Sequence, residues 1–173
     1  DLAGVTTEVF LSDAAHPNPY YLPYLLLGFA EAYRDDAAAL RAMLAEPWRT
    51  AIPPLFNGQH DAGPINAALP AVPAAALDPA QLAGFRADPD HFLRRLLREN
   101  SLLEGWRPRA PLRLFHCAGD RDVPPANSAR AREAFAAAGA TDVQLFDPLP
   151  SASHGDCAQP ALLAVKLWFD SPR

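Results

Sequence analysis

Two ionisable side chains follow the ends of two predicted strands. Asp120 comes after a strand predicted over 112–117, and His154 comes after a strand predicted over 142–146. The carboxyl ends of neighbouring parallel strands meet at one edge of a sheet, where α/β active sites are built. A carboxylate at hydrogen-bond distance from an imidazole fixes its tautomer, while the other ring nitrogen accepts a nucleophile's proton. Order and spacing therefore predict the acid and base of a Ser/Asp/His triad.

Each of the two residues also has a simpler interpretation. An Asp after a strand is commonly a turn residue or a helix cap, and a lone loop His is commonly just solvated. A second carboxylate, Asp122, lies two residues on and competes for the role of the acid. The prediction thus rests on the pair and not on either residue alone.

The elements that must position this pair lie in residues 111–173. After the first strand we expect an amphipathic helix over 126–138, closed by Gly139, and after the second strand a helix over 160–170. Strand, helix, strand and helix with short connections predict a βαβ crossover and therefore parallel strands. Two parallel strands are not a stable sheet on their own. We therefore expect this region to be the edge of a larger sheet and, alone, to be prone to aggregation through its unpaired strand edges.

Residues 1–110 have a different pattern, helical and rich in proline. Helices are predicted over 20–33, 36–44, 79–87 and 90–100, the third with Asp78 as its N-cap. The segment 47–79 carries seven prolines, which break helices into short pieces and stiff loops. The predicted organisation is a helical, proline-rich cap over 1–110 and an α/β segment over 111–173.

Several stretches resemble known segments of bacterial α/β-hydrolases of the secreted-lipase-like and prolyl-oligopeptidase-like groups. Residues 115–124 followed by Asn127-Ser128 look like the acid-bearing segment, and 154–157 with 160–170 look like the histidine segment and last helix. Residues 21–28 and 52–55 are similar to the helical cap. Many members have Gly where Cys117 stands, which keeps Asp122 in competition. The resemblance implies the C-terminal portion of an α/β-hydrolase fold, a serine hydrolase of acyl groups with Asp120 and His154 as catalytic residues, and an apolar wall from the cap.

The nucleophile of such an enzyme is not in this sequence. No Gly-x-Ser-x-Gly occurs in the 173 residues, although that motif gives the sharp turn on which a nucleophilic serine sits. The chain opens on Asp1-Leu2-Ala3-Gly4, so we expect a cut or incomplete product, inactive alone, whose partner is the missing N-terminal half. An esterase or lipase acting on a small ester is favoured. A peptidase and a non-catalytic hydrolase fragment are the alternatives.

Composition excludes some functions. The formal net charge of −5 argues against nucleic acid or an anionic membrane surface as the main partner. The longest apolar run, 20–30, holds a proline and a glycine and is shorter than the ~18 residues of a membrane-spanning helix. The resemblance implies no metal or organic cofactor.

The two cysteines, Cys117 and Cys157, allow more than one interpretation. They flank the predicted acid and base at three residues' distance, so contact between acid and base would bring the sulfurs near bridging range. A disulfide would imply an oxidising compartment, so a secreted or periplasmic location is expected; two buried thiols would fit the cytosol. A zinc site is a weaker alternative, because its candidate ligands lack a zinc-finger spacing: His116, Cys117, His154, Asp156 and Cys157.

Overall fold

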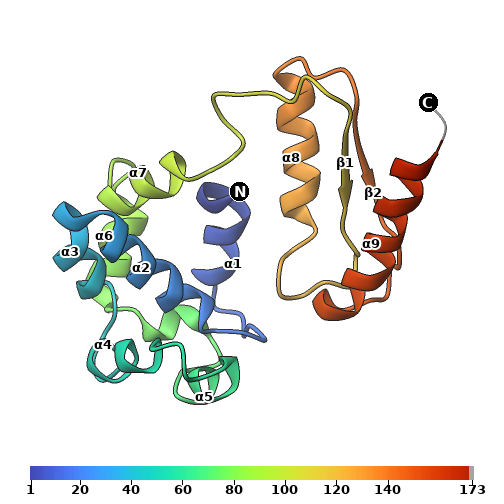
Figure 1. The fold of residues 1–173 in the computed structure, drawn as a ribbon. Helices are drawn as coiled ribbons and strands as arrows, with labels where there is room; N and C mark the ends of the chain where they lie inside the picture. The colour runs from blue at the N-terminus through green and yellow to red at the C-terminus, as the bar shows by residue number, and fades with distance from the viewer. Residues whose placement is uncertain (172–173) are drawn as a thin grey trace. The chain divides into compact units, whose positions relative to one another are not determined.

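The computed structural model describes residues 1–171, which fall into two compact units (Figure 1). The helical unit comprises Thr7–Asn100. The site unit comprises residues 1–6 and the chain from Ser101 onward. The predicted role of residues 1–110 as a cap stays a prediction.

The helical unit consists of short helices separated by proline-containing turns. Its α-helices are α1 Thr7–Phe10, α2 Tyr21–Ala32, α3 Ala37–Ala42, α4 Trp48–Ala51, α5 Ala62–Ala67, α6 Pro79–Ala87 and α7 Phe92–Glu99. Short 3₁₀ turns lie at Arg34–Asp36, Pro53–Leu55 and Pro73–Ala76. The helices predicted over 20–33, 79–87 and 90–100 are confirmed as α2, α6 and α7. The one predicted over 36–44 is a 3₁₀ turn followed by the shorter α3.

Apolar residues at helical spacing form the core of this unit. Leu26 of α2, Leu40 of α3 and Leu96 of α7 are fully buried, together with Met43. The start of α6 follows the predicted cap, because the Asp78 carboxylate accepts hydrogen bonds from the backbone N–H groups of residues 80 and 81. The described helices include none that combines the length and apolarity needed to cross a bilayer.

The site unit is a strand–helix–strand–helix segment. Strand β1 is Leu112–Phe115, α8 is Ala126–Ala137, β2 is Val143–Phe146 and α9 is His154–Asp170, with a π-helical turn at Leu2–Thr6. The strands pair in parallel, with Leu112 opposite Val143, which confirms the predicted crossover. Figure 1 shows α8 and α9 on opposite sides of the strands. Gly139 has a φ of 88° just past α8, as the predicted helix end requires.

The last helix begins earlier than predicted. It was expected to begin at Pro160, yet α9 begins at His154 and contains Pro160 in its interior. The cause is a capping signal before the proline: the Ser153 hydroxyl accepts from the Asp156 backbone N–H and hydrogen-bonds to the Asp156 carboxylate. His154 is therefore the first residue of a helix and not a loop residue, so its backbone is fixed by regular structure.

Candidate active site

The predicted acid lies in a tight turn after β1. The backbone N–H of Asp120 donates to the Cys117 carbonyl, which brings the side chain back over the turn. Its Oδ1 accepts from the backbone N–H groups of Asp122 and Val123, both at 2.9 Å. With a relative exposure of 6%, Asp120 is one of two buried polar or charged residues among those that the structure describes, the other being His16. Hydrogen bonds within the turn thus make up for much of the water that this carboxylate loses.

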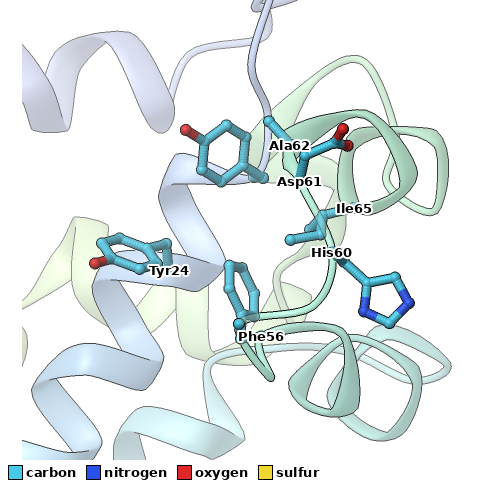
Figure 2. A pocket seen from close by; sticks show the side chains of 8 residues that line it. Tyr24, Phe56, His60, Asp61, Ala62 and Ile65 are labelled. Carbon is cyan, nitrogen blue, oxygen red and sulfur yellow. The ribbon is translucent and has the colours of Figure 1, made fainter.

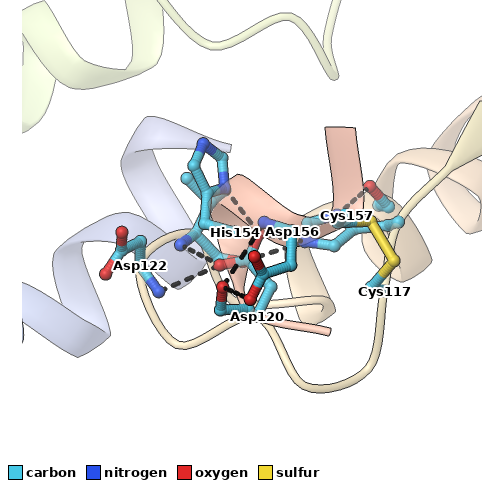
Figure 3. Close-up of polar contacts among 10 residues, drawn as sticks. Cys117, Asp120, Asp122, His154, Asp156 and Cys157 are labelled. Carbon is cyan, nitrogen blue, oxygen red and sulfur yellow. Dashed lines mark hydrogen bonds and ion pairs between the residues drawn. A yellow bond between two sulfur atoms is a disulfide. The ribbon is translucent and has the colours of Figure 1, made fainter. Parts of the chain in front are cut away.

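The predicted base contacts the acid directly. Nδ1 of His154 lies 2.7 Å from Oδ2 of Asp120, as Figure 3 shows. An ionised carboxylate only accepts hydrogen bonds, so Nδ1 carries the hydrogen and Nε2 of the neutral ring is left as an acceptor. The His154 side chain is 50% exposed. In the neutral tautomer Nε2 thus carries no hydrogen, and the ring is half exposed in the described structure, which is the arrangement that a general base requires.

Electrostatics favour an ionised acid. Burial acts to raise the pKa of Asp120, but the hydrogen bonds from His154 and from the backbone of Val123 and Asp122 together hold this pKa below its ordinary value. At neutral pH the carboxylate is therefore charged, and a positive charge that forms on His154 would be stabilised beside it.

A disulfide links the segments that carry the acid and the base. Cys117, just after β1, is bonded to Cys157 in the first turns of α9, with a Cα–Cα distance of 5.9 Å (Figure 3). The disulfide alternative is thus the one that the structure contains, and both sulfurs are taken up by it and not free for a metal. Among the described residues no group of three or more His, Cys, Asp and Glu side chains is placed to bind a metal ion.

Gly119 allows the two segments to approach closely. A Cβ at this position would lie 2.7 Å from the Ala152 carbonyl oxygen and 2.9 Å from the Ser151 carbonyl carbon. These are backbone atoms of the loop before α9, so they cannot rotate away. The acid turn and the His154 segment therefore pack at a distance that only glycine permits.

His116 belongs to the site, although the sequence suggested it only as a metal ligand. Its Nε2 lies 2.9 Å from the Val123 carbonyl oxygen and 3.3 Å from Oδ2 of Asp120, and its Nδ1 lies 2.7 Å from the Ser128 hydroxyl. A signal for this was present in the sequence, since His116 stands at the end of the strand that leads into the acid turn. Asp122 contributes its backbone N–H to Asp120, and Asp156 belongs to the cap of α9.

A pocket of about 280 Å³ in the helical unit is a separate candidate (Figure 2). Tyr24 and Phe56 form an aromatic wall, with ring centroids 5.7 Å apart. Its two ionisable side chains other than tyrosine have local partners: Asp61 caps α5 through the Gly63 N–H, and His60 hydrogen-bonds to Asn57. The pocket offers apolar surface and no acid–base pair comparable to Asp120 and His154.

Comparisons with known proteins agree with this geometry at the level of the fold. No protein-family model matches the sequence, and a search of curated proteins finds no match. A candidate hydrolase from Legionella pneumophila is 26% identical, with a TM-score of 0.75 over 98% of this chain and 44% of that chain. The rice cell wall degrading esterase LipA from Xanthomonas oryzae is similar in a ligand-bound form, at 22% identity and a TM-score of 0.69 over 96% of this chain and 44% of that one. A further structure of that esterase gives 25% identity and a TM-score of 0.61 over 92% and 42%.

The chain thus spans less than half the length of the solved structures that it resembles. Within the part that aligns, this chain contributes helices and a small parallel sheet. The fold of these 173 residues is that of part of a hydrolase-like structure.

Proposed function

We propose that this chain supplies the acid, Asp120, and the base, His154, of a serine hydrolase of the α/β-hydrolase type that cleaves esters. One observation carries the proposal: the 2.7 Å contact between the buried Asp120 carboxylate and Nδ1 of the half-exposed His154 ring. This arrangement sets the tautomer that proton abstraction requires, and it lies at the carboxyl ends of parallel strands, where such sites form.

The chemistry follows from the two ring nitrogens. As a serine oxygen bonds to the acyl carbon, its proton passes to Nε2 of His154, and Asp120 stabilises the resulting imidazolium without taking the proton. When the tetrahedral intermediate collapses, the bond to the alcohol breaks and Nε2 returns the proton to that leaving group. A water molecule then repeats both steps on the acyl-serine, which releases the acid and restores the serine. Protons and bonds balance without a cofactor.

The serine belongs to sequence outside these 173 residues. No serine of the chain has the flanking glycines of a nucleophile turn, and similar structures are more than twice as long. We call the protein in which residues 1–173 are joined to the nucleophile-bearing half the parent enzyme. That half would supply the backbone donors of the oxyanion hole and pair with the strands of the site unit.

An ester substrate is proposed over a peptide because the similar structures include an esterase at 25% identity. An extracytoplasmic site of action, secreted or periplasmic, is proposed because the bond between Cys117 and Cys157 is of the kind that persists in oxidising compartments.

The test is covalent labelling of the nucleophile with a fluorophosphonate, followed by mass spectrometry. We expect one serine of the parent enzyme to react, together with turnover of a short-chain p-nitrophenyl ester. His154→Ala should lower the labelling rate and kcat by about 10³-fold or more, and Asp120→Asn should lower both by orders of magnitude. The 173-residue chain alone should neither hydrolyse the ester nor react.

A matched control is His60→Ala, which removes an exposed histidine of the helical unit and should leave both rates unchanged. Wild-type labelling in a folded His154→Ala variant would refute the assignment of the base. Reaction of a serine within the 173-residue chain would refute the placement of the nucleophile.

A further inference from the structure

The acid of the proposed site contacts a second imidazole as well as the base. His116 is largely buried, with its side chain 11% exposed, at the point where β1 runs into the acid turn. Its backbone N–H donates to the Phe146 carbonyl, which continues the pairing of β1 with β2 by one residue. This bond fixes the backbone position from which the His116 side chain extends. The proposed reaction assigns nothing to this side chain.

The neighbours of the ring determine its tautomer. Nε2 faces two acceptors, the Val123 carbonyl at 2.9 Å and the Asp120 carboxylate at 3.3 Å, so in the neutral ring Nε2 carries the hydrogen. Nδ1 is then an acceptor and receives the Ser128 hydroxyl hydrogen at 2.7 Å. The hydroxyl on α8 thereby keeps the N–H of His116 directed at the acid turn.

With His116 included, each carboxylate oxygen of Asp120 has two donors near it. Oδ1 accepts from the backbone N–H groups of Asp122 and Val123, while Oδ2 faces His154 at 2.7 Å and His116 at 3.3 Å. Val123 is held on both sides, because its N–H donates to Asp120 and its carbonyl accepts from His116. A carboxylate with partners on both oxygens has little freedom to rotate away from the base.

We propose that His116 is a positioning residue, which holds Asp120 and its turn in the orientation that keeps the hydrogen on Nδ1 of His154. The proposal deepens the hydrolase function above and rests on it for its meaning in catalysis. Ser128 contributes indirectly, because its hydroxyl fixes the tautomer of His116. A side chain with only a packing role would be replaceable by an apolar one of similar size without effect on His154.

The test compares His116→Leu with His116→Gln in the 173-residue chain. Both substitutes are close to histidine in size, but only the glutamine amide can donate toward Val123 and Asp120. The readout is the tautomer ratio of neutral His154, taken from its ring ¹⁵N chemical shifts, since a ring without a fixed partner favours hydrogen on Nε2. We expect the Nδ1–H to Nε2–H ratio to fall roughly tenfold in His116→Leu, as for the loss of one buried hydrogen bond, here the bond to the Val123 carbonyl that holds the acid turn. His116→Gln should keep most of the wild-type ratio.

Two further variants complete the design. Ser128→Ala retains the His116 ring, so it should lower the ratio in the same direction but less, and it carries the test if His116→Leu does not fold. His60→Leu removes a histidine of the helical unit and should leave the ratio as it is. An unchanged ratio in a folded His116→Leu or Ser128→Ala variant would overturn the positioning role.

Measurement of ester turnover in the parent enzyme separates the two proposals. We expect His116→Leu to lower kcat by about tenfold with little change in KM, and His116→Gln to recover most of it. A wild-type kcat in His116→Leu would overturn the catalytic meaning of the positioning. A parent enzyme without hydrolase activity, but with a tautomer ratio that responds, would refute the proposed function and support the link between His116 and Asp120.

Discussion

The helical unit and the site unit are stabilised in different ways. In the helical unit, apolar side chains from successive helices are fully buried, among them Leu26, Leu40, Ile52 and Leu96. The buried apolar residues of the site unit are few, and most belong to a small cluster around the disulfide: Cys117, Ala152 and Cys157. The helical unit thus has a core of its own, whereas the site unit depends on a few specific bonds.

The site unit also leaves apolar side chains on its surface that a larger core would bury. Helix α9 exposes Leu162, Leu163, Leu167 and Phe169, each by more than half. An apolar face of this kind commonly marks a surface that another part of a protein covers. Without a large core, the site unit positions Asp120 and His154 through the disulfide and through the hydrogen bonds around the Asp120 carboxylate.

The largest expected effect is on the helical unit. Leu96→Ala removes a fully buried side chain and should cost about 2–5 kcal/mol in the free energy of unfolding, through lost burial and the cavity that remains. The free energy of unfolding is measured by urea denaturation, and hydrogen exchange of the helical-unit amides shows whether the loss falls in this unit. Leu102→Ala, at a leucine of the site unit that is 70% exposed, is the control for loss of the same side chain from the surface and should have almost no effect on either unit. Equal costs for the two variants would contradict the contrast in packing.

Loss of the disulfide should act on the other unit. Cys117→Ser combined with Cys157→Ser opens a link across 40 residues and should destabilise the site unit by about 2–4 kcal/mol. Amides of β1 and α9 should exchange faster, while those of α2 and α7 keep their protection. A uniform loss of protection across both units would show that they unfold together, and the comparison above would then be wrong.

Substitutions of two glycines test the close approach at the site. Gly119→Ala places a methyl group against the backbone of Ser151 and Ala152, so we expect a loss of about 1–3 kcal/mol and a weaker contact between Asp120 and His154. Gly155→Ala, in the first turn of α9, meets nothing within 4 Å and should be neutral or stabilising by up to about 1 kcal/mol. Thermal melts and the His154 ring shifts report both effects. Similar losses in the two variants would mean that the space around Gly119 is not the cause.

Acid should weaken the site through Asp120. Burial opposes ionisation of this carboxyl, but its hydrogen bonds hold the pKa of Asp120 below the ordinary value in the folded chain. The resulting stabilisation is therefore complete above about pH 5, where the carboxyl is ionised in the unfolded chain as well, and is lost as the pH falls through the lowered pKa. The difference in unfolding free energy between wild type and Asp120→Asn should accordingly shrink between about pH 5 and pH 2. A difference that is constant with pH would argue against the lowered pKa.

Much of the site unit was predictable because its signals are local. The apolar segments at 112–117 and 142–146 and the Gly139 helix end each predict their element without reference to the rest of the chain. Parallel pairing then follows from the helix between the strands, and it predicts that Asp120 and His154 share an edge. The predicted start of α9 at Pro160 is wrong, because Ser153 and Asp156 form a cap that starts the helix six residues before the proline.

What could not be predicted depends on distant atoms. The sequence around Gly119 is that of a common turn. Glycine is needed there because the backbone of residues 151–152, distant in the sequence, lies close to it in the folded chain. The position of His116 at the end of the strand before the acid turn is visible in the sequence, but nothing in its spacing indicates Ser128 or Val123 as partners of the ring. The bond between Cys117 and Cys157 is one of three alternatives that the sequence leaves open, because spacing alone does not fix the direction of two side chains.

The smallest expected effect is that of Leu163→Ala, which tests whether the exposed apolar face of α9 is covered in the parent enzyme. Leu163 on α9 is 57% exposed, so Leu163→Ala should change the unfolding free energy of the 173-residue chain by less than about 0.5 kcal/mol. In the parent enzyme the same substitution should cost about 2 kcal/mol or more, provided that the nucleophile-bearing half covers this face. Leu96→Ala should cost the same in both proteins, because Leu96 is already fully buried in the 173-residue chain. Equal, small effects of Leu163→Ala in the two proteins would mean that α9 faces solvent in the parent enzyme and that the site unit is complete without a covering layer.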